Sequence, residues 1–231
     1  MTHRHNICTS ILRLSLSLLT GVTAFCDGMA QSKLLAIEKD SIPLFKGFAL
    51  STDVVGPAMM ALGDYGEVEG ALRINLHDQY FPIFELGYGR AKHAEDIVTG
   101  ITYQTSAPYF RIGCDLNLLK NKHARNRIYG GLRYAFTSYK VDITHPSFKD
   151  PVWGWSAPVD IHGAQCSQHW AEVVFGVDAY ITGPLHLGWT VRYKRRIAHS
   201  NGDAGNGWYV PGYGKTGDTR LGANFNIIID I

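Results

Sequence analysis

The sequence predicts an all-β protein, a closed antiparallel eight-stranded up-and-down transmembrane β-barrel of a bacterial outer membrane. The final segment supplies the first observation. Every second position from Leu221 to Ile231 is apolar, and residues such as Gly222, Asn224 and Asn226 lie between them. This period of two is typical of a strand between an apolar and a wet environment. The second observation is that the pattern recurs upstream, and the third is that an export signal precedes it.

The N-terminus reads as a secretory signal peptide over residues 1–30. A basic start at residues 3–5 is followed by an apolar centre at residues 11–19 and by small residues up to Ala30, where cleavage is expected. Cleavage after Ala24 is the alternative. The apolar centre is too short for a transmembrane anchor, which needs about 20 apolar residues.

The mature chain then divides into a periplasmic N-terminal lead over residues 31–45 and the barrel over residues 46–231. The barrel contains eight alternating segments, each about ten residues or longer, which is the length that a tilted strand needs to cross a bilayer. The segments, with residues that mark the apolar face of each, are 46–55 (Phe48, Leu50, Val54), 67–77 (Val68, Leu72, Leu76), 82–91 (Phe84, Leu86, Tyr88), 106–118 (Phe110, Ile112, Leu116), 128–141 (Leu132, Tyr134, Phe136), 169–181 (Val173, Phe175, Val177), 185–197 (Leu187, Trp189, Val191) and 218–231 (Leu221, Phe225, Ile229).

The connections between these segments alternate in length. Short links at residues 78–80, 120–127 and 182–184 follow the second, fourth and sixth segments, whereas the longest link spans about residues 142–168. Short turns on one rim and long loops on the other are typical of outer-membrane barrels. With the N-terminus in the periplasm, we expect the long loops to lie outside the cell.

The face opposite to the apolar one carries charges of both signs and many glycines. The alternative is a secreted soluble β-barrel binding protein, but such a barrel would pack large apolar side chains inward and polar ones outward. An eight-stranded barrel is too narrow for a water channel, and side chains fill its interior. We expect the interior charges to pair with one another, because an unpaired buried charge is costly. The predicted lumenal charge network comprises Arg73, Glu85, Glu172, Arg192, Lys194 and Arg196.

Turn lengths predict the partners within this network. Links of three residues at 78–80 and 182–184 keep the apolar and polar faces of the joined strands matched. An acid surrounded by cations is expected to stay ionised. The predicted pairs are Arg73 with Glu85, Ile181 with Leu185, and Glu172 with Lys194, with Arg192 and Arg196 diagonal to Glu172.

Aromatic residues in the long connections are candidates for surface recognition, because exposed apolar groups on loops often mark binding sites. Outward aromatics on the strands are explained by the aromatic girdle of a membrane barrel. The candidate surface-recognition residues are Phe148, Trp153, Trp155, Trp208, Tyr209 and Tyr213.

Composition excludes several classes of partner and cofactor. Removing residues 1–30 takes Arg4, Arg13 and Asp27 from 22 basic and 20 acidic residues, which leaves 20 and 19. A balance near zero argues against nucleic acid as a partner. Cys114 and Cys166 are too scattered for a metal site, and the ten histidines show no ligand spacing. No cofactor is therefore expected. A disulfide between the two cysteines is allowed but not favoured.

The mature chain resembles the small eight-stranded outer-membrane barrels of Gram-negative bacteria, and in particular an uncharacterised group of short barrel proteins. The alternating strands, the closing segment 220–227 and the aromatic loop 208–214 carry this resemblance. Arg220, Gly222, Phe225 and Ile227 match the signal that the insertion machinery reads in the last strand of such barrels, although many members end on an aromatic residue. The resemblance implies a fold and a location and no activity.

A lipopolysaccharide (lipid A)-modifying enzyme is the alternative function. Barrel lipid A deacylases show a His–x–Ser–Asn pattern, whereas His199 and Ser200 are adjacent here. Strand parity sends adjacent residues to opposite faces, while a nucleophile and its base must come within hydrogen-bond reach. We therefore expect an integral membrane protein with a structural or surface-recognition role and no catalysis. The expected partners are outer-membrane lipid and lipopolysaccharide, and transiently the barrel insertion machinery and periplasmic chaperones.

Overall fold

The computed structural model describes residues 41–94, 100–149, 156–202 and 207–231. The elements below belong to one compact unit, Ile42–Ile231. The predicted signal peptide over residues 1–30 and most of the periplasmic lead lie outside the described residues.

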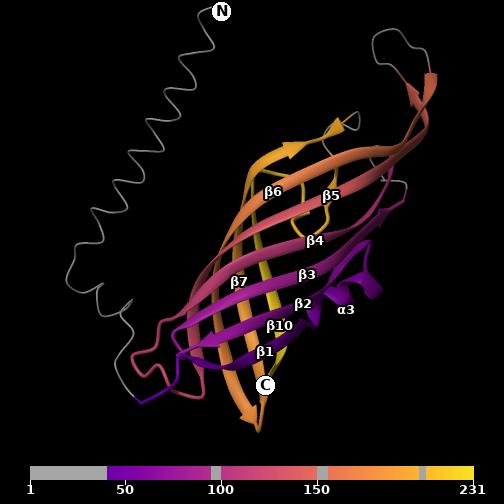
Figure 1. Ribbon diagram of the computed structural model, residues 1–231. Helices are drawn as coiled ribbons and strands as arrows, with labels where there is room; N and C mark the ends of the chain where they lie inside the picture. Colours follow the sequence, from indigo (N-terminus) through magenta and orange to yellow (C-terminus); the bar gives the residue numbers. More distant parts are fainter. Residues whose placement is uncertain (1–40, 95–99, 150–155, 203–206) are drawn as a thin grey trace, which may run out of the picture. The chain divides into compact units, whose positions relative to one another are not determined.

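Eight long antiparallel strands close into a barrel in the ring order β1-β10-β7-β6-β5-β4-β3-β2, which confirms the predicted fold class (Figure 1). The ring closes where β1 pairs with β10. A helix follows β1, and a short hairpin of two strands lies between β7 and β10. The elements are β1 Phe45–Asp53, α3 Val55–Leu62, β2 Tyr65–Leu76, β3 Tyr80–His93, β4 Thr102–Asn117, β5 Arg127–Lys149, β6 Ser156–Thr182, β7 Leu185–Ser200, β8 Tyr209–Val210, β9 Gly214–Lys215 and β10 Thr219–Asp230.

The polarity of the barrel is the reverse of that of a soluble protein. Leu86, Leu132 and Leu221 on the outer surface are 65%, 67% and 76% exposed, whereas Arg111 and Asp115 inside the barrel are 0% exposed. Soluble barrels bury such leucines and expose such charges. The apolar exterior places the barrel in a lipid bilayer, and the closed antiparallel form places it in the outer membrane. None of the helices in the described ranges is long and apolar enough to span a membrane.

The turn between β2 and β3 lies one residue earlier than the sequence predicts. His77 and Asp78 hold left-handed backbone angles, φ 59° and 56°, and Asn75 brackets the turn by accepting a hydrogen bond of 2.8 Å from the Asp78 amide. Moving the turn by one residue shifts the strand register by two. Arg73 therefore pairs with Ile83 and Glu85 with Ala71, so the predicted pair of Arg73 with Glu85 is wrong, although both side chains still face the lumen.

The turn between β6 and β7 combines a tight link with a bulge. Gly183, at φ 53°, and Pro184 join Thr182 directly to Leu185, so the predicted pair of Ile181 with Leu185 is wrong. The extra residue, Ile181, interrupts the ladder and keeps its side chain on the outer surface. Such a bulge restores the register that matches polar and apolar faces. The predicted pair of Glu172 with Lys194 is confirmed as a result.

The longest predicted loop is largely an extension of the β5–β6 hairpin. Pairing of β5 with β4 ends at Thr144, and pairing of β6 with β7 begins at Ser167. Beyond these residues β5 and β6 pair only with each other, and the hairpin projects past the rim of the barrel (Figure 1). The side chains between residues 146 and 157 lie outside the described set.

A closed barrel satisfies its backbone groups within the ring, so it is expected to resist detergent when cold. Unheated and boiled samples of the purified protein should migrate differently on a detergent gel. Recovery of the native protein from the soluble periplasmic fraction would contradict this prediction.

Asp78 is expected to stabilise the turn between β2 and β3 in a pH-dependent way. Partial burial raises the pKa of Asp78, but hydrogen bonds from Lys46, His123 and Asn75 outweigh it and hold that pKa below its ordinary range. The carboxylate therefore stabilises the fold above the pKa it has in the unfolded chain, and this contribution is lost as the pH falls through its folded pKa. Asp78→Asn should cost about 1–3 kcal/mol in unfolding free energy at neutral pH and little at acid pH. An equal loss at both pH values, measured by urea unfolding in vesicles, would contradict this.

Candidate functional site

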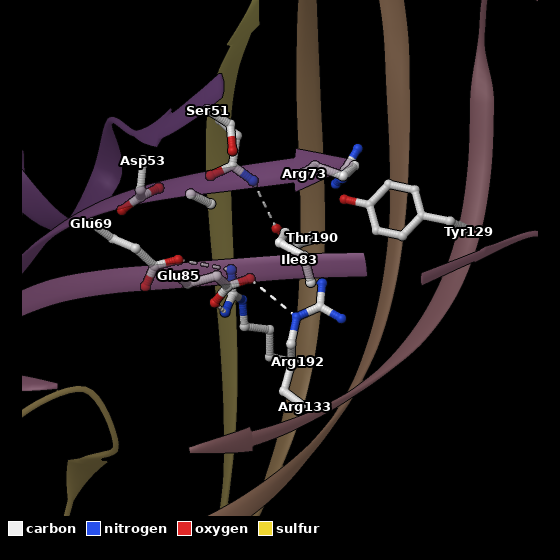
Figure 2. Close-up of a pocket in the computed structure, with 12 residues that line it drawn as sticks. Ser51, Asp53, Glu69, Arg73, Ile83, Glu85, Tyr129, Arg133, Thr190 and Arg192 are labelled. Carbon is white, nitrogen blue, oxygen red and sulfur yellow. Dashed lines mark hydrogen bonds and ion pairs between the residues drawn. The ribbon is translucent and has the colours of Figure 1, made fainter. Parts of the chain in front are cut away.

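The middle of the lumen holds carboxylates and guanidinium groups that contact one another across the barrel. Arg192 on β7 lies 2.7 Å from Glu85 on β3 and 2.9 Å from Glu69 on β2 (Figure 2). Arg133 on β5 lies 3.1 Å from the second oxygen of Glu85. Each of these ion pairs joins two strands that are not neighbours in the ring, so the pairs cross-link the barrel wall through its interior.

Glu172 joins the same cluster from the side of β6. Arg111 lies 3.0 Å from one oxygen of Glu172 through Nε and also contacts Glu69, while Arg192 lies 3.4 Å from the other oxygen of Glu172. The indole of Trp170 donates a hydrogen bond of 2.7 Å to Glu172. The acid therefore faces two guanidinium groups and is fully enclosed by its partners.

A second layer of ion pairs lies on the side of the short turns. Arg73 contacts Asp178 at 2.6 Å and Asp115 at 3.5 Å, and it stacks over the ring of Tyr129 with 4.7 Å to the ring centroid. Arg133 donates two parallel hydrogen bonds, of 2.7 and 2.9 Å, to the carboxylate of Asp115. This bidentate geometry makes a charge-assisted pair stronger and more specific than a single contact.

The two layers leave almost no free space between them. The cavity between them has a volume of about 10 Å³, which is room for about one water molecule. In the middle of the lumen, five buried acids face five buried bases, so that this part of the interior holds no large excess of charge. The side chains concerned are Glu69, Glu85, Asp115, Glu172 and Asp178 against Arg73, Arg111, Arg133, Arg192 and Lys194.

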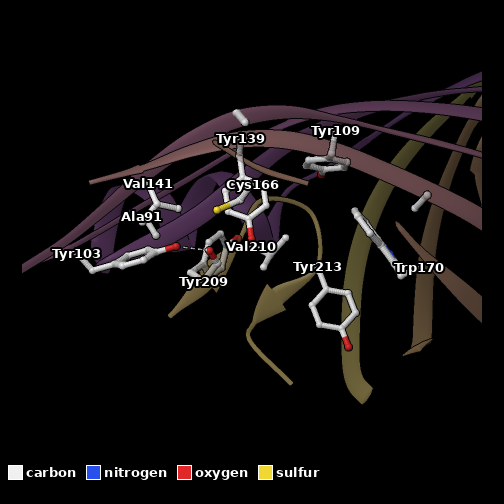
Figure 3. Packing of buried hydrophobic residues seen from close by; sticks show 12 residues of the cluster. Ala91, Tyr103, Tyr109, Tyr139, Val141, Cys166, Trp170, Tyr209, Val210 and Tyr213 are labelled. Carbon is white, nitrogen blue, oxygen red and sulfur yellow. Dashed lines mark hydrogen bonds between the residues drawn. The ribbon is translucent and has the colours of Figure 1, made fainter. Parts of the chain in front are cut away.

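The hairpin of β8 and β9 folds into the mouth of the barrel on the side of the long connections (Figure 3). Its turn carries the backbone carbonyl of Gly212, which accepts hydrogen bonds from Arg111 at 2.7 Å and from Lys194 at 2.8 Å. The hydroxyl of Tyr103 donates to the carbonyl of Tyr209 at 2.7 Å. The hairpin therefore closes this mouth, and its Gly212 carbonyl accepts hydrogen bonds from two cations of the charge network.

Gly212 is required where it stands because of both its backbone angle and its neighbour. Its φ of 79° lies in the left-handed region that favours glycine. A Cβ atom here would come within 2.4 Å of the ring of Tyr109. The hairpin therefore packs its bare backbone on that ring, and a larger residue would lift it out of the mouth.

The hairpin corrects the prediction of a recognition surface at Trp208, Tyr209 and Tyr213. Tyr209 and Tyr213 are 2% and 1% exposed inside the mouth of the barrel, and Trp208 is half-buried against Tyr65. Because the loop bends inward, these rings pack inside the mouth of the barrel, in the same cluster as Trp170 and Tyr139. Of the other candidates, Trp153 and Trp155 and the side chain of Phe148 lie outside the described residues.

The remaining predicted site residues lie near the rim. Arg196 sits opposite Trp170 and contacts Asp218, so its charge is compensated there and not by Glu172. His199 and Ser200 are exposed at the end of β7, where neighbouring side chains alternate between the two faces.

One stretch of the barrel wall is incomplete. The last pair between β1 and β10 is Asp53 with Asn226, whereas β10 begins at Thr219 and pairs along this stretch with β7. On the other side, the last pair between β1 and β2 is Thr52 with Gly70. Because β1 ends at Asp53, the part of β10 before Asn226 and the part of β2 before Gly70 have no strand between them in the described barrel.

The side chain of Asp53 terminates this seam. Its carboxylate accepts hydrogen bonds from the amide of Phe225 on β10 at 3.1 Å and from the amide of Gly56 in α3 at 2.6 Å. A carboxylate at a helix N-terminus satisfies backbone donors that have no partner within the helix. The Asp53 carboxylate thus caps the amide of Phe225 on β10 and the amide of Gly56 in α3 at the same time.

Helix α3 lies against the open edge of β2 (Figure 1). Two glycines allow this close approach, because a Cβ atom at Gly66 would come within 2.2 Å of the backbone of Met60, and one at Gly56 within 2.2 Å of the Glu67 carbonyl. The helix therefore covers the β2 side of the opening and leaves the β10 side free.

Two adjacent cavities remain at this opening. An apolar groove of about 540 Å³ runs between α3 and Phe225, and a mixed cavity of about 360 Å³ lies between α3, the hairpin and β10. Both are lined by Val55, Met59 and Tyr65. We call them the groove and the wall cavity. The charged residues that line the wall cavity are Asp53, Glu67, Lys194, Lys215 and Arg220.

Sequence reasoning missed Asp53, Glu67, Lys215 and α3 as parts of a site. The signal for the helix was present, since Asp53 precedes Pro57 and a run of good helix formers. Within the described ranges, no group of three or more His, Cys, Asp or Glu residues is arranged to hold a metal ion.

Glu172→Ala is expected to destabilise the barrel, because it leaves Arg111, Arg192 and Lys194 short of a counter-charge. Breaking a buried pair by removing one partner costs about 3–5 kcal/mol. Glu172→Gln keeps the hydrogen-bonding shape and serves as the matched control with a smaller loss. Equal unfolding midpoints for the wild type and Glu172→Ala in vesicles would show that the pairing does not stabilise the barrel.

Comparison with solved structures finds similar chain paths at low identity. A major outer membrane protein from Thermus thermophilus is 10% identical, with a TM-score of 0.45 over 80% of this chain and 98% of that chain. Ail of Yersinia pestis, solved with the heparin analogue sucrose octasulfate, is 12% identical, with a TM-score of 0.37 over 80% and 93%. CarO of Acinetobacter baumannii is 12% identical, with a TM-score of 0.38 over 84% and 100%.

The sequence matches no curated protein. A family model, in contrast, matches residues 11–230, which is nearly the whole chain. The chain therefore belongs to the family described as "Domain of unknown function (DUF6048)".

Proposed function

We propose that this protein is a non-conducting outer-membrane barrel with a structural and recognition role at its outward rim. The observation that carries the proposal is the filled lumen. Two layers of ion pairs occupy its middle, and the cavity between them admits about one water molecule. A narrow barrel filled with side chains is a rigid support and not a pore.

The outward rim supplies the surface for such a role. The β5–β6 hairpin extends past the barrel, where its strands pair only with each other. Long connections on one rim face the outside of the cell in barrels of this type. A hairpin that is not needed to close the ring is free to contact other molecules.

The test is conductance in a planar lipid bilayer. The wild type is expected to give no stepwise ion current, because charge pairs block the lumen independently of the mouth. A variant with residues 208–215 replaced by a Gly-Ser linker should also remain closed, since the two ion-pair layers lie below the hairpin. Stepwise current from the wild type would overturn the proposal.

A trimmed variant tests the role of the rim. Replacing residues 146–158 by a short turn should leave the heat-modifiable migration unchanged, because the described residues of this segment pair with neither β4 nor β7. Loss of the folded barrel in this variant would show that the extension serves closure and not recognition.

A further inference from the structure

We propose that the opening between α3 and β10 binds a phosphate-bearing lipid of the surrounding membrane. Its acyl chain would lie in the groove and its head group in the wall cavity. This inference adds a ligand site to the barrel wall and goes beyond the proposed role of the rim.

The groove provides the apolar half of the site. Its lining is almost wholly hydrophobic, and Met59 and Leu62 of α3 are 40% and 90% exposed along it. The groove opens on the outer surface of the barrel, where lipid chains are the solvent. A lipid acyl chain bound between α3 and Phe225 would fill the groove.

The wall cavity provides the charged half. Lys194, Lys215 and Arg220 line it, and the opposing acids are Glu67 and Asp53. The Asp53 carboxylate is already engaged by the amides of Gly56 and Phe225. Lys194 uses one of its three donors on the Gly212 carbonyl. The three cations outnumber the two acids of the lining, and an anionic head group complements them.

The two halves adjoin, which favours an amphiphile over a purely polar or purely apolar ligand. Val55, Met59 and Tyr65 line both the groove and the wall cavity. The volumes, about 540 and 360 Å³, lie in the usual range of small-molecule sites. Lys215 stands at the junction, with its ammonium 5.6 Å from the centroid of Tyr65 and 5.3 Å from that of Trp208.

A peptide strand added to the edge of β10 is the competing occupant. The edge above Asp53 has no β1 partner, and such edges accept strands. Charge and the apolar groove favour the lipid, because strand addition recognises backbone groups and requires neither. Strand pairing between two copies is therefore treated as an outcome that would overturn the proposal.

The test is native mass spectrometry of the whole barrel in an uncharged detergent with dilauroyl phosphatidic acid. The wild type should retain one phosphatidic acid molecule, and dilauroylglycerol, which has the same chains without phosphate, should not remain bound. The double variant Lys215→Ala/Arg220→Ala should lose at least about tenfold in affinity, since each surface cation contributes about fivefold near an anionic lipid. Equal retention of dilauroylglycerol would overturn the proposal.

Matched variants separate the site from the rest of the surface. Arg90→Ala/Lys92→Ala removes two exposed cations from the outer side of β3 and should leave affinity unchanged. Ala223→Phe should abolish binding by filling the wall cavity, whereas Ala223→Ser should retain it. Because Arg220 also holds the carbonyls of Lys215 and Thr216, the single variant Lys215→Gln gives the charge effect without loosening the hairpin.

Each variant is first checked for heat-modifiable migration, so that loss of binding is read only on folded barrels. Loss of affinity in the Arg90→Ala/Lys92→Ala control equal to that in the site variants would overturn the proposal. A mass of two chains that Ala223→Phe abolishes, without retained lipid, would assign the opening to a second copy. None of these outcomes depends on conductance, so failure here is distinct from failure of the sealed-lumen proposal.

Discussion

Neutrality of the lumen is the constraint on which the rest of this barrel depends. A charge buried without a partner costs several kcal/mol, and the cavity between the ion-pair layers has room for only about one water molecule. Arg73, Arg111, Arg133 and Arg192 each contact a carboxylate on a strand that is not their neighbour in the ring. Guanidinium groups suit this task because their planar forks contact two or more carboxylates at once. The network therefore fixes how the strands face one another as well as neutralising charge.

This constraint also explains the shape of the mouth. The ion pairs leave donors of Arg111 and Lys194 pointing outward along the axis, and the carbonyl of Gly212 accepts from both. A backbone carbonyl adds no net charge, so it satisfies the donors without disturbing the balance below. These two hydrogen bonds fix the turn of the hairpin over the charge network, and the aromatic cluster of the mouth packs around it.

The fold was largely predictable from sequence, because an alternation of period two records which side of a strand meets lipid. The strand faces and the pair of Glu172 with Lys194 followed from parity. The pair of Arg73 with Glu85 did not, since a left-handed His77-Asp78 turn moves the register by two without changing any face. The inward hairpin was also beyond reach, because exposed and buried aromatic loops have the same composition. The early end of β1 at Asp53 was signalled only by the helix start that follows it, where Pro57 precedes a run of good helix formers.

The seam between β1 and β10 has a consequence for how the molecule is assembled. It is the shortest ladder in the ring: its strand pairs run from Ala49 with Asp230 to Asp53 with Asn226, and backbone hydrogen bonds of Phe48 with Ile231 and of Val54 with Phe225 flank them. Short ladders open and close more readily than long ones, and closure of the ring joins the segments most distant in sequence. In the closed barrel, Gly212 of the hairpin between β7 and β10 packs on the ring of Tyr109. The edge at which the ring closes is therefore also the edge that holds the wall opening, and Asp53 lies at the end of the closing ladder.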